Sequence, residues 1–279
     1  MDEFPRTMVG GVSVSRMIIG TNWFLGWSHT SAAKDRFIKT YHNRQSIASV
    51  LEVFFKHGID TVMGPLHPLL REALNETEQR TGRAGILITT PHFNILPNGP
   101  ADMEPERVFD ACQQGGAAIC MPHQCMTDAL MDKMHEKIRD IDRYTRLIRE
   151  RGMIPGLSTH MPETVIYADK TGADVETYIQ IYNAIGFLMQ VEVDWVMRII
   201  KNAKKPVMTI KPMAAGRLLP PVGLAFVWNT IRDQDMVTVG TTTPDEAREV
   251  IELSLDFLNR RLPDNELQKT RSKRSLEAA

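Results

Sequence analysis

Histidines follow three consecutive predicted strands: His92 stands after the third strand, His123 after the fourth and His160 after the fifth. Imidazole is the side chain best suited to metal binding and acid–base chemistry near neutral pH. Because the carboxyl ends of parallel barrel strands meet at one rim, we expect the three rings to lie close together. They could hold a divalent metal, Zn or Mn, with Glu192 as a fourth ligand, beside an open position for water or substrate.

The same side chains could also work without a metal. His123 and His160 would then act as catalytic groups or hydrogen-bond the substrate, and a structural role is a third possibility. The spacing does not match a contiguous motif such as His-Glu-x-x-His. The sequence therefore predicts a histidine-rich rim and leaves the presence of a metal open.

An amine is predicted at the same rim, because Lys211 ends the seventh strand. A desolvated lysine could form a Schiff base with a carbonyl substrate, or stay charged and bind a carboxylate or phosphate. We expect the charged form, since no second lysine is predicted beside it and Arg217 could share the anion. The residues predicted to bind substrate are Asn22, Trp23, Asn94, Arg217 and Thr241.

Two segments near the rim have polar or aromatic character. Trp23 and Trp27 offer flat faces suited to sugar-like or aromatic compounds. The polar segment Ser28–Asn43 has little periodicity, which predicts a mobile lid loop. Thr241–Thr243 stand before a predicted helix and could bind a phosphate through backbone N–H groups.

The elements that must position these residues alternate along the whole chain, which predicts a parallel sheet covered by helices. A count of eight units favours a (β/α)8 barrel over an open doubly wound sheet. The predicted strands are Met17–Asn22, Gly58–Met63, Gly85–Thr90, Ala117–Met121, Met153–Ser158, Val175–Ile181, Pro206–Lys211 and Met236–Gly240. The predicted helices are Gln45–Lys56, Pro68–Thr81, Glu106–Gln113, Ala129–Glu150, Pro162–Lys170, Asp194–Asn202, Val222–Ile231 and Pro244–Arg260.

Length and composition agree with one barrel domain. The chain has 279 residues, close to the roughly 250 of a typical (β/α)8 barrel. We expect this domain to span residues 1–265 and the basic segment 266–279 to be a disordered tail. The net charge of −1 gives no reason to expect a nucleic acid or a membrane as partner, so a small-molecule substrate is expected. A homo-oligomer remains open.

The start of the chain lacks the apolar run of a secretory signal. Cys112, Cys120 and Cys125 form no Cys-x-x-Cys pair and are interpreted as core or pocket thiols, which fits a reducing compartment. We therefore expect a cytoplasmic protein.

Several segments, in order over almost the whole chain, resemble those of one known barrel family. Gly11–Arg16 followed by Ile19-Gly20-Thr21 resembles the family's opening, in which a short hairpin plugs the barrel bottom. Gly58-Ile59-Asp60, Lys211–Leu218 and Gly240–Glu246 are similar to later strand ends of the family. The resemblance implies an aldo-keto reductase-like barrel with a short N-terminal hairpin.

The residues that the family uses for catalysis are mostly replaced. The resemblance implies carbonyl reduction by NADPH, with a tyrosine acid tuned by a lysine and an aspartate. Here the aspartate position falls at Met63, the tyrosine near Pro68 and the lysine at Thr90-Pro91, and only the family's histidine has a counterpart, His123.

The positions that would hold the cofactor are also replaced. The family's amide groups at the nicotinamide fall at Thr159 and Ile179, its stacking aromatic at Ile210 and its adenine-contacting asparagine near Val250. No residue is therefore predicted to bind a nucleotide cofactor, and tight NADPH binding is not expected.

These observations lead to three hypotheses for function. The first is a non-redox enzyme, a lyase, aldolase or isomerase, that acts on a carbohydrate-like carbonyl compound through His123, His160 and Lys211. The second is a divergent NADPH-dependent reductase. The third is a catalytically inactive barrel that binds a ligand.

Overall fold

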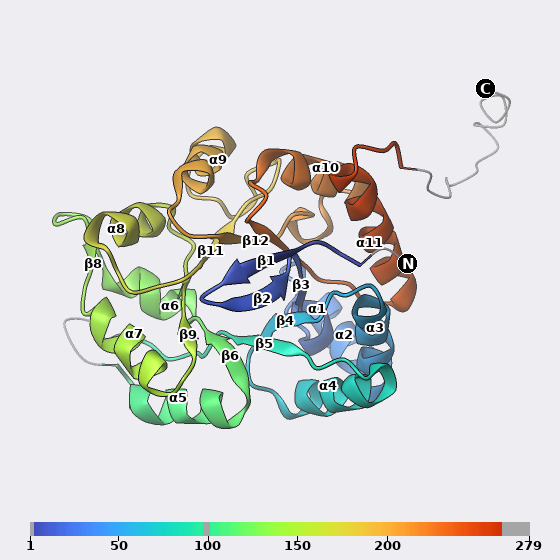
Figure 1. Ribbon diagram of the computed structural model, residues 1–279, viewed down its shortest axis with the longest axis horizontal. Coiled ribbons are helices and arrows are strands. Elements are labelled where there is room, and N and C mark those ends of the chain that lie inside the picture. The colour runs from blue at the N-terminus through green and yellow to red at the C-terminus, as the bar shows by residue number, and fades with distance from the viewer. Residues whose placement is uncertain (1–2, 97–100, 264–279) are drawn as a thin grey trace, which may run out of the picture.

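Nine short parallel strands form one sheet that curls into a nearly closed barrel, and helices cover its outside (Figure 1). This computed structural model describes residues 3–96 and 101–263. In spatial order the strands are β10 (Leu157–Ser158), β11 (Tyr178–Ile181), β12 (Val207–Ile210), β13 (Met236–Val239), β3 (Met17–Gly20), β4 (Thr61–Gly64), β5 (Ile86–Thr89), β6 (Ala117–Cys120) and β9 (Ile154–Pro155). The predicted α/β barrel is confirmed, and all eight predicted strand segments are present.

The predicted fifth strand is split at Gly156 into β9 and β10. The Gly156 N–H donates to the carbonyl of Cys120 at 3.2 Å on one side, and the Leu157 N–H donates to Thr177 at 3.1 Å on the other. The segment therefore joins the two ends of the sheet into a ring. A Cβ at Gly156 would lie 2.7 Å from Met121 and 2.9 Å from Thr177, so only glycine fits without a shift of these neighbours.

Except for the helix that begins at Ile141, the helices on the outside begin within two residues of their predicted starts. They are α3 (Arg44–Lys56), α4 (Pro68–Thr81), α5 (Pro105–Gln114), α7 (Ile141–Glu150), α8 (Glu163–Thr171), α9 (Val193–Asn202), α10 (Pro220–Thr230) and α11 (Pro244–Leu258). Asn43 and Ser46 form a capping box at α3, as do Thr243 and Glu246 at α11. Each box satisfies N–H groups that have no partner within the helix.

Buried apolar side chains form two layers, because successive residues of a strand point to opposite faces. Ile18 of β3 packs in the inner layer, which fills the barrel, whereas Met17 and Ile19 pack in the outer layer against the helices. The barrel is therefore a filled core with its open space at one rim.

A two-stranded hairpin of β1 (Arg6–Val9) and β2 (Val12–Ser15) closes the other end and lies in front of the barrel in Figure 1. Gly10 and Gly11 connect its strands with φ of 54° and 88°, values that favour glycine. Val9 and Val14 are fully buried in the inner layer. The hairpin plug implied by the resemblance is confirmed.

The prediction of a long loop over Ser28–Asn43 is wrong, because α2 (Ala32–Tyr41) occupies most of this segment. The side chain of Ser31 caps the helix by accepting from the Lys34 N–H. Within α2 only Ile38 is fully buried. A helix with one buried position shows no apolar stripe, which is why its periodicity was not visible.

The prediction of one helix over Ala129–Glu150 is also wrong. Its first half holds the short helix η1 (Asp128–Leu130) and a hairpin of β7 (Met131–Asp132) and β8 (Lys137–Ile138). Asp132 accepts from both the backbone N–H and the ring of His135, at 3.1 and 2.8 Å. Such side-chain bonds to the local backbone compete with helix formation.

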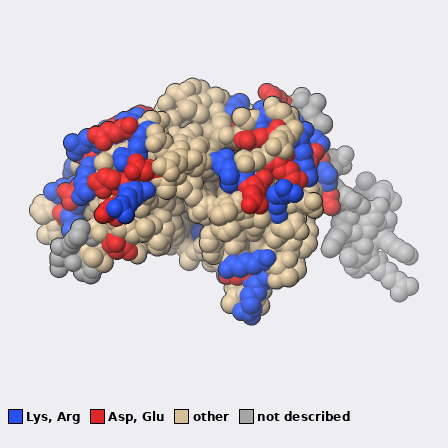
Figure 2. Space-filling view, turned by 90° about the horizontal axis from the view of Figure 1, so that it is seen from below, with Lys and Arg blue, Asp and Glu red and all other residues tan. Residues whose placement is uncertain are grey.

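Three further short helices lie near the strand ends: α1 (Asn22–Leu25), α6 (Gln124–Thr127) and η2 (Ala214–Gly216). The predicted tail over residues 266–279 lies outside the described residues. Across residues 3–96 and 101–263, every helix is too short or too polar to cross a membrane. Figure 2 shows acidic and basic side chains intermingled in two main areas of one face, separated by a band with few charges.

A buried carboxylate at Asp235 joins β12, β13 and the end of α10. Asp235 is fully buried and accepts from the Val207 N–H at 2.9 Å, and from the backbone and guanidinium N–H groups of Arg232. Its own carbonyl accepts from Arg16 Nε at 3.0 Å. This network links β13 to the strands on both sides of it, β12 and β3.

We predict that Asp235→Ala lowers the free energy of unfolding by about 3–5 kcal/mol, because it leaves Arg232 partly buried without its counterion. Asp233→Ala is the matched control, since Asp233 is exposed two residues away, and should cost less than about 0.5 kcal/mol. Chemical denaturation measures both values. Equal losses of unfolding free energy in the two variants would show that the buried carboxylate stabilises the fold no more than the exposed one.

Candidate functional site

A cavity of about 980 Å³ opens at the carboxyl ends of the barrel strands. Its size lies at the upper end of the roughly 300–1,000 Å³ of small-molecule sites. Residues from the ends of β3, β4, β5, β6, β10, β12 and β13 line it, and its polar lining includes Asn22, His29, His92, His123, His160 and Lys211. The cavity therefore gathers the residues that the sequence placed at the rim.

Lys211 follows β12 and reaches into this cavity. Its φ of 62° is left-handed, as are those of Ala214 and Ala215 at 49° and 55°. Three non-glycine residues in this region within one loop store backbone strain, which is most often found at functional sites. Burial lowers the pKa of the Lys211 ammonium to about 8.

His29 contacts this amine and was not predicted from the sequence. Its Nδ1 lies 2.9 Å from the carbonyl of Trp27, which assigns the proton to Nδ1. Its Nε2 then accepts from Lys211 Nζ at 3.5 Å. Burial, followed by the Lys211 charge, lowers the pKa of His29. His29 comes from the segment interpreted as a loop, 182 residues from Lys211, and no local signal connects the two.

His160 lies in the same electrostatic environment. Burial, then the charges of Lys211, His123 and His29, lower its pKa to about 4. Its backbone N–H donates to Asp128 Oδ2 at 3.2 Å, and the hydroxyl of Thr159 donates to Asp128 Oδ1 at 2.5 Å. Asp128 thus positions the loop that carries His160, while the imidazole is neutral at pH 7.

His92 and His123 lie side by side, with ring centroids 5.2 Å apart. The predicted proximity of these two histidines is confirmed. Their loops are linked, because the His123 N–H donates to the carbonyl of Pro91 at 2.9 Å. Burial, followed by the charges of His92 and Lys211, lowers the pKa of His123.

The structure groups the possible metal ligands differently from the sequence prediction. Within the described part of the chain, His92 and His123 form a ligand group with Cys125, and the three ligand atoms lie within 4.8 Å of one another. His160 and Glu192 are not in this group. Glu192 is exposed at the start of α9 and does not line the cavity, because the chain runs outward between β11 and that helix.

The five predicted substrate-binding residues separate into two sets. Asn22, Trp23 and Thr241 line the cavity. Asn94 does not, because its backbone and side-chain N–H groups donate to Asp102 at 2.8 and 2.9 Å.

Arg217 also lies outside the cavity lining. Its guanidinium stacks over the ring of Phe187, 4.0 Å from the centroid, and donates to the carbonyl of Ala214 at 3.1 Å. These contacts direct it away from Lys211. These contacts do not support an anion shared by the two cations, and that expectation stays a prediction.

The predicted phosphate position at the start of α11 is filled by a side chain of the protein itself. Glu246 Oε2 accepts from the Thr242 N–H at 2.6 Å and the Thr243 N–H at 3.2 Å. A carboxylate here already neutralises the positive end of the helix dipole. An incoming phosphate would have to displace it.

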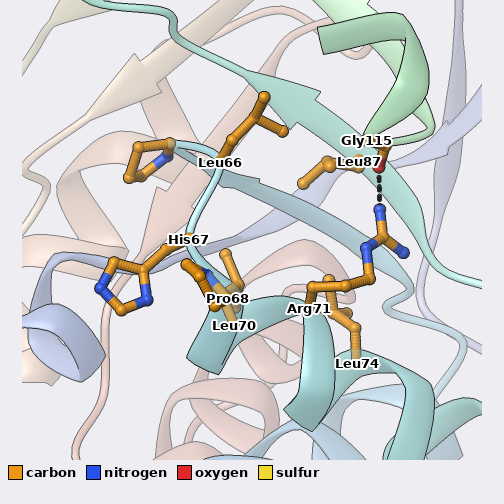
Figure 3. Close-up of a pocket in the computed structure, with 9 residues that line it drawn as sticks. Leu66, His67, Pro68, Leu70, Arg71, Leu74, Leu87 and Gly115 are labelled. Carbon is orange, nitrogen blue, oxygen red and sulfur yellow. Dashed lines mark hydrogen bonds between the residues drawn. The ribbon is translucent and has the colours of Figure 1, made fainter. Parts of the chain in front are cut away.

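A second, smaller cavity of about 230 Å³ lies beside β4 and α4 (Figure 3). Leu66, Leu70, Leu74 and Leu87 make its lining mostly apolar. Its one guanidinium, on Arg71, donates to the carbonyl of Gly115, as the dashed line in Figure 3 marks. Because that guanidinium is already bonded to a backbone carbonyl and the rest of the lining is mostly apolar, this cavity is not the candidate active site.

No protein-family model and no curated protein sequence matches the chain. The structure is nevertheless similar to a chain assigned to the aldo-keto reductases from Pseudomonas aeruginosa, with a TM-score of 0.65 at 16% identity, covering 92% of this chain and 98% of that one. An aldo-keto reductase from Bacillus halodurans, solved in its holo form, has a TM-score of 0.58 at 14% identity, covering 95% and 99%.

The barrel of thiamine phosphate pyrophosphorylase from Pyrococcus furiosus has a TM-score of 0.51 at 13% identity, covering 88% of this chain and 95% of that one. At such low identities a structural likeness establishes fold and leaves function to the site. The chain therefore has a barrel fold similar to that of the aldo-keto reductases.

Proposed function

We propose that this protein is a non-redox enzyme that enolises a small, hydroxylated carbonyl compound, as an isomerase, lyase or aldolase. The observation that carries the proposal is the gathering of Lys211, His29, His123 and His160 in one cavity. Proton removal next to a carbonyl needs a base and a group that stabilises the developing negative oxygen. A neutral imidazole and a buried ammonium supply these two parts.

Lys211 has the charge needed to stabilise the carbonyl oxygen as that oxygen becomes negative. With a pKa of about 8, most of its amine is protonated at pH 7. A cation in a cavity that excludes water stabilises an oxyanion more strongly than one in bulk solvent. The neutral fraction, roughly a tenth at pH 7, leaves a Schiff base as the competing mechanism, and borohydride trapping of a substrate adduct distinguishes it.

His160 is suited to the proton transfer. The proton leaves the carbon for an imidazole nitrogen, and the C–H electron pair moves into the carbon–carbon bond as the carbonyl becomes an enolate. Return of the proton to the neighbouring carbon, with the hydroxyl proton of that carbon moving to the enolate oxygen, gives an isomerase. Expulsion of a β-hydroxyl, protonated by the imidazolium and released as water, gives a lyase. Addition of the enolate to a second carbonyl, whose oxygen takes up the proton, gives an aldolase. The positive charge of Lys211 lowers the pKa of His160, so a substrate anion paired with Lys211 would raise that pKa and strengthen the base.

The rest of the cavity supports a hydroxylated substrate. Trp23 offers an aromatic face, and Asn22 and Thr241 offer hydrogen-bonding groups on the same side of the cavity. Thr241 is buried, and its hydroxyl has no partner among the described residues. A buried polar atom of this kind gains stability from a ligand hydroxyl.

A reductase is less well supported, although the similar structures include aldo-keto reductases. Met63 and Thr90 line the cavity where the family's aspartate and lysine are expected, and its lining in the described residues includes no tyrosine. Tyr178 and Tyr182 are engaged elsewhere, by Asp169 at 2.6 Å and Thr230 at 3.0 Å. A phenol that could protonate a carbonyl is therefore not supplied by these residues.

We predict that the protein exchanges a carbon-bound proton of its substrate with solvent, and that Lys211→Ala slows this exchange by about 100-fold or more. A panel of small hydroxyaldehydes, hydroxyketones and their phosphates and carboxylates in D₂O, followed by proton NMR, identifies the substrate and measures the rate. Lys201→Ala, at an exposed position of α9, is the matched control and should leave the rate unchanged.

If no compound in the panel exchanges but one stabilises the protein thermally, the barrel binds a ligand without catalysis. If exchange is found and Lys211→Ala retains it at the wild-type rate, Lys211 is not part of the reaction.

We predict that kcat/KM first rises and then falls as the pH increases. His160 must be neutral, so kcat/KM should rise as pH passes about 4, and Lys211 must be protonated, so it should fall as pH passes about 8. Lys211→Arg keeps its charge in alkaline solution and should remove the second limb at a reduced rate. An alkaline limb that is unchanged in Lys211→Arg would assign it to another group.

We predict that NADPH binds only weakly, because Glu246 fills the amides at the start of α11 and apolar Ile179 and Ile210 line the cavity. Fluorescence titration of NADPH into the protein should give no saturation in the micromolar range, with NADH as the control that lacks the extra phosphate. A micromolar dissociation constant for NADPH would favour the reductase instead.

A further inference from the structure

We propose that His92, His123 and Cys125 bind a single zinc-class metal ion at the edge of the cavity. The proposal goes beyond the enolisation reaction and does not depend on it. It assigns Cys125 as a ligand in place of His160 and Glu192, and it rests on the geometry of two neighbouring loops.

The three side chains already lie near the separations that one ion requires. His92 Nδ1 is 3.6 Å from Cys125 Sγ, and all three ligand atoms lie within 4.8 Å of one another. A nitrogen at about 2.1 Å and a sulfur at about 2.3 Å from a tetrahedral zinc ion are about 3.6 Å apart. The remaining ligand distances, at most 4.8 Å, need to shorten by no more than roughly 1.2–1.4 Å, within the range of side-chain rotation.

The loops that carry these ligands are anchored. Phe93, next to His92, is fully buried with its ring centroid 6.0 Å from those of Phe109 and Tyr144. The His123 N–H donates to the carbonyl of Pro91 at 2.9 Å, which joins the loop after β6 to the one after β5 without using the thiol proton. Such a preformed scaffold reduces the ordering cost of metal binding.

The donor set selects the kind of metal. One thiolate and two imidazoles are typical of zinc and disfavour manganese, which prefers oxygen ligands. On binding, the metal–sulfur bond forms as the thiol S–H bond breaks, and the proton leaves to solvent. Asp102, held by Asn94, lies close enough to His92 for their charges to interact, and its carboxylate offsets part of the added positive charge.

The fourth coordination position should face the cavity. His92 and His123 line the cavity, whereas Cys125 does not and approaches from behind them. Three protein ligands with an open fourth position are typical of catalytic rather than structural zinc sites. A metal here would meet a substrate oxygen or a water molecule.

Cobalt titration of the full chain, purified without nickel resin and dialysed against a chelator, tests the site. We expect one Co²⁺ per chain, with a thiolate-to-cobalt charge-transfer band and the visible bands of tetrahedral cobalt, both lost on adding Zn²⁺. Cys125→Ser should remove the charge-transfer band. Cys125→Ser and His92→Ala should each weaken cobalt binding by more than about 100-fold. His135→Ala is the matched control, because His135 is an exposed histidine paired with Asp132, and should bind cobalt like the wild type.

Circular dichroism and thermal melting of the metal-free variants establish that each remains folded. Absence of the charge-transfer band in the wild type, or cobalt binding that is unchanged in Cys125→Ser and His92→Ala, would overturn the site. Because the readout is the spectrum of the bound ion, the result does not depend on whether isotope exchange is found. Failure of the reaction and failure of the metal site are therefore separate outcomes.

Discussion

Closure of a parallel sheet into a barrel is the constraint on which the site depends. Every parallel strand delivers its carboxyl end to the same rim, and the interior below is filled by alternate side chains and the N-terminal hairpin. Polar groups can gather only at the open rim. Gly156 permits this closure, because its missing side chain leaves room for Met121 and Thr177 where the first and last strands of the sheet meet.

At that rim, burial and the charge of one lysine together set the chemistry of the histidines. Burial lowers the pKa of the Lys211 amine. Burial first, and then neighbouring charges that include Lys211, lower the pKa values of His29, His123 and His160. The result is a mostly charged lysine surrounded by neutral imidazoles at pH 7. An anionic or strongly polarised substrate oxygen is the group that best compensates this arrangement.

The residues at this rim differ from those that the family resemblance implies. Glu246 fills the helix N-terminus with a carboxylate of the protein, and Met63 and Thr90 stand where a tuned acid would need charged partners. At the same rim, two imidazoles that line the cavity lie close to a thiol that does not line it. Fold and function are separable here because the barrel core does not depend on which residues end its strands.

The sequence by itself determined the barrel, because alternating strands and helices with their caps are local signals: Pro68–Thr81 was predicted with both ends correct. It also predicted the neighbouring positions of His92 and His123, since adjacent parallel strands end together. Only the tertiary structure placed His29 against Lys211 and Cys125 beside the two histidines. Those contacts depend on loop paths after the strands, which are set by long-range packing and side-chain hydrogen bonds and leave no periodic trace in the chain.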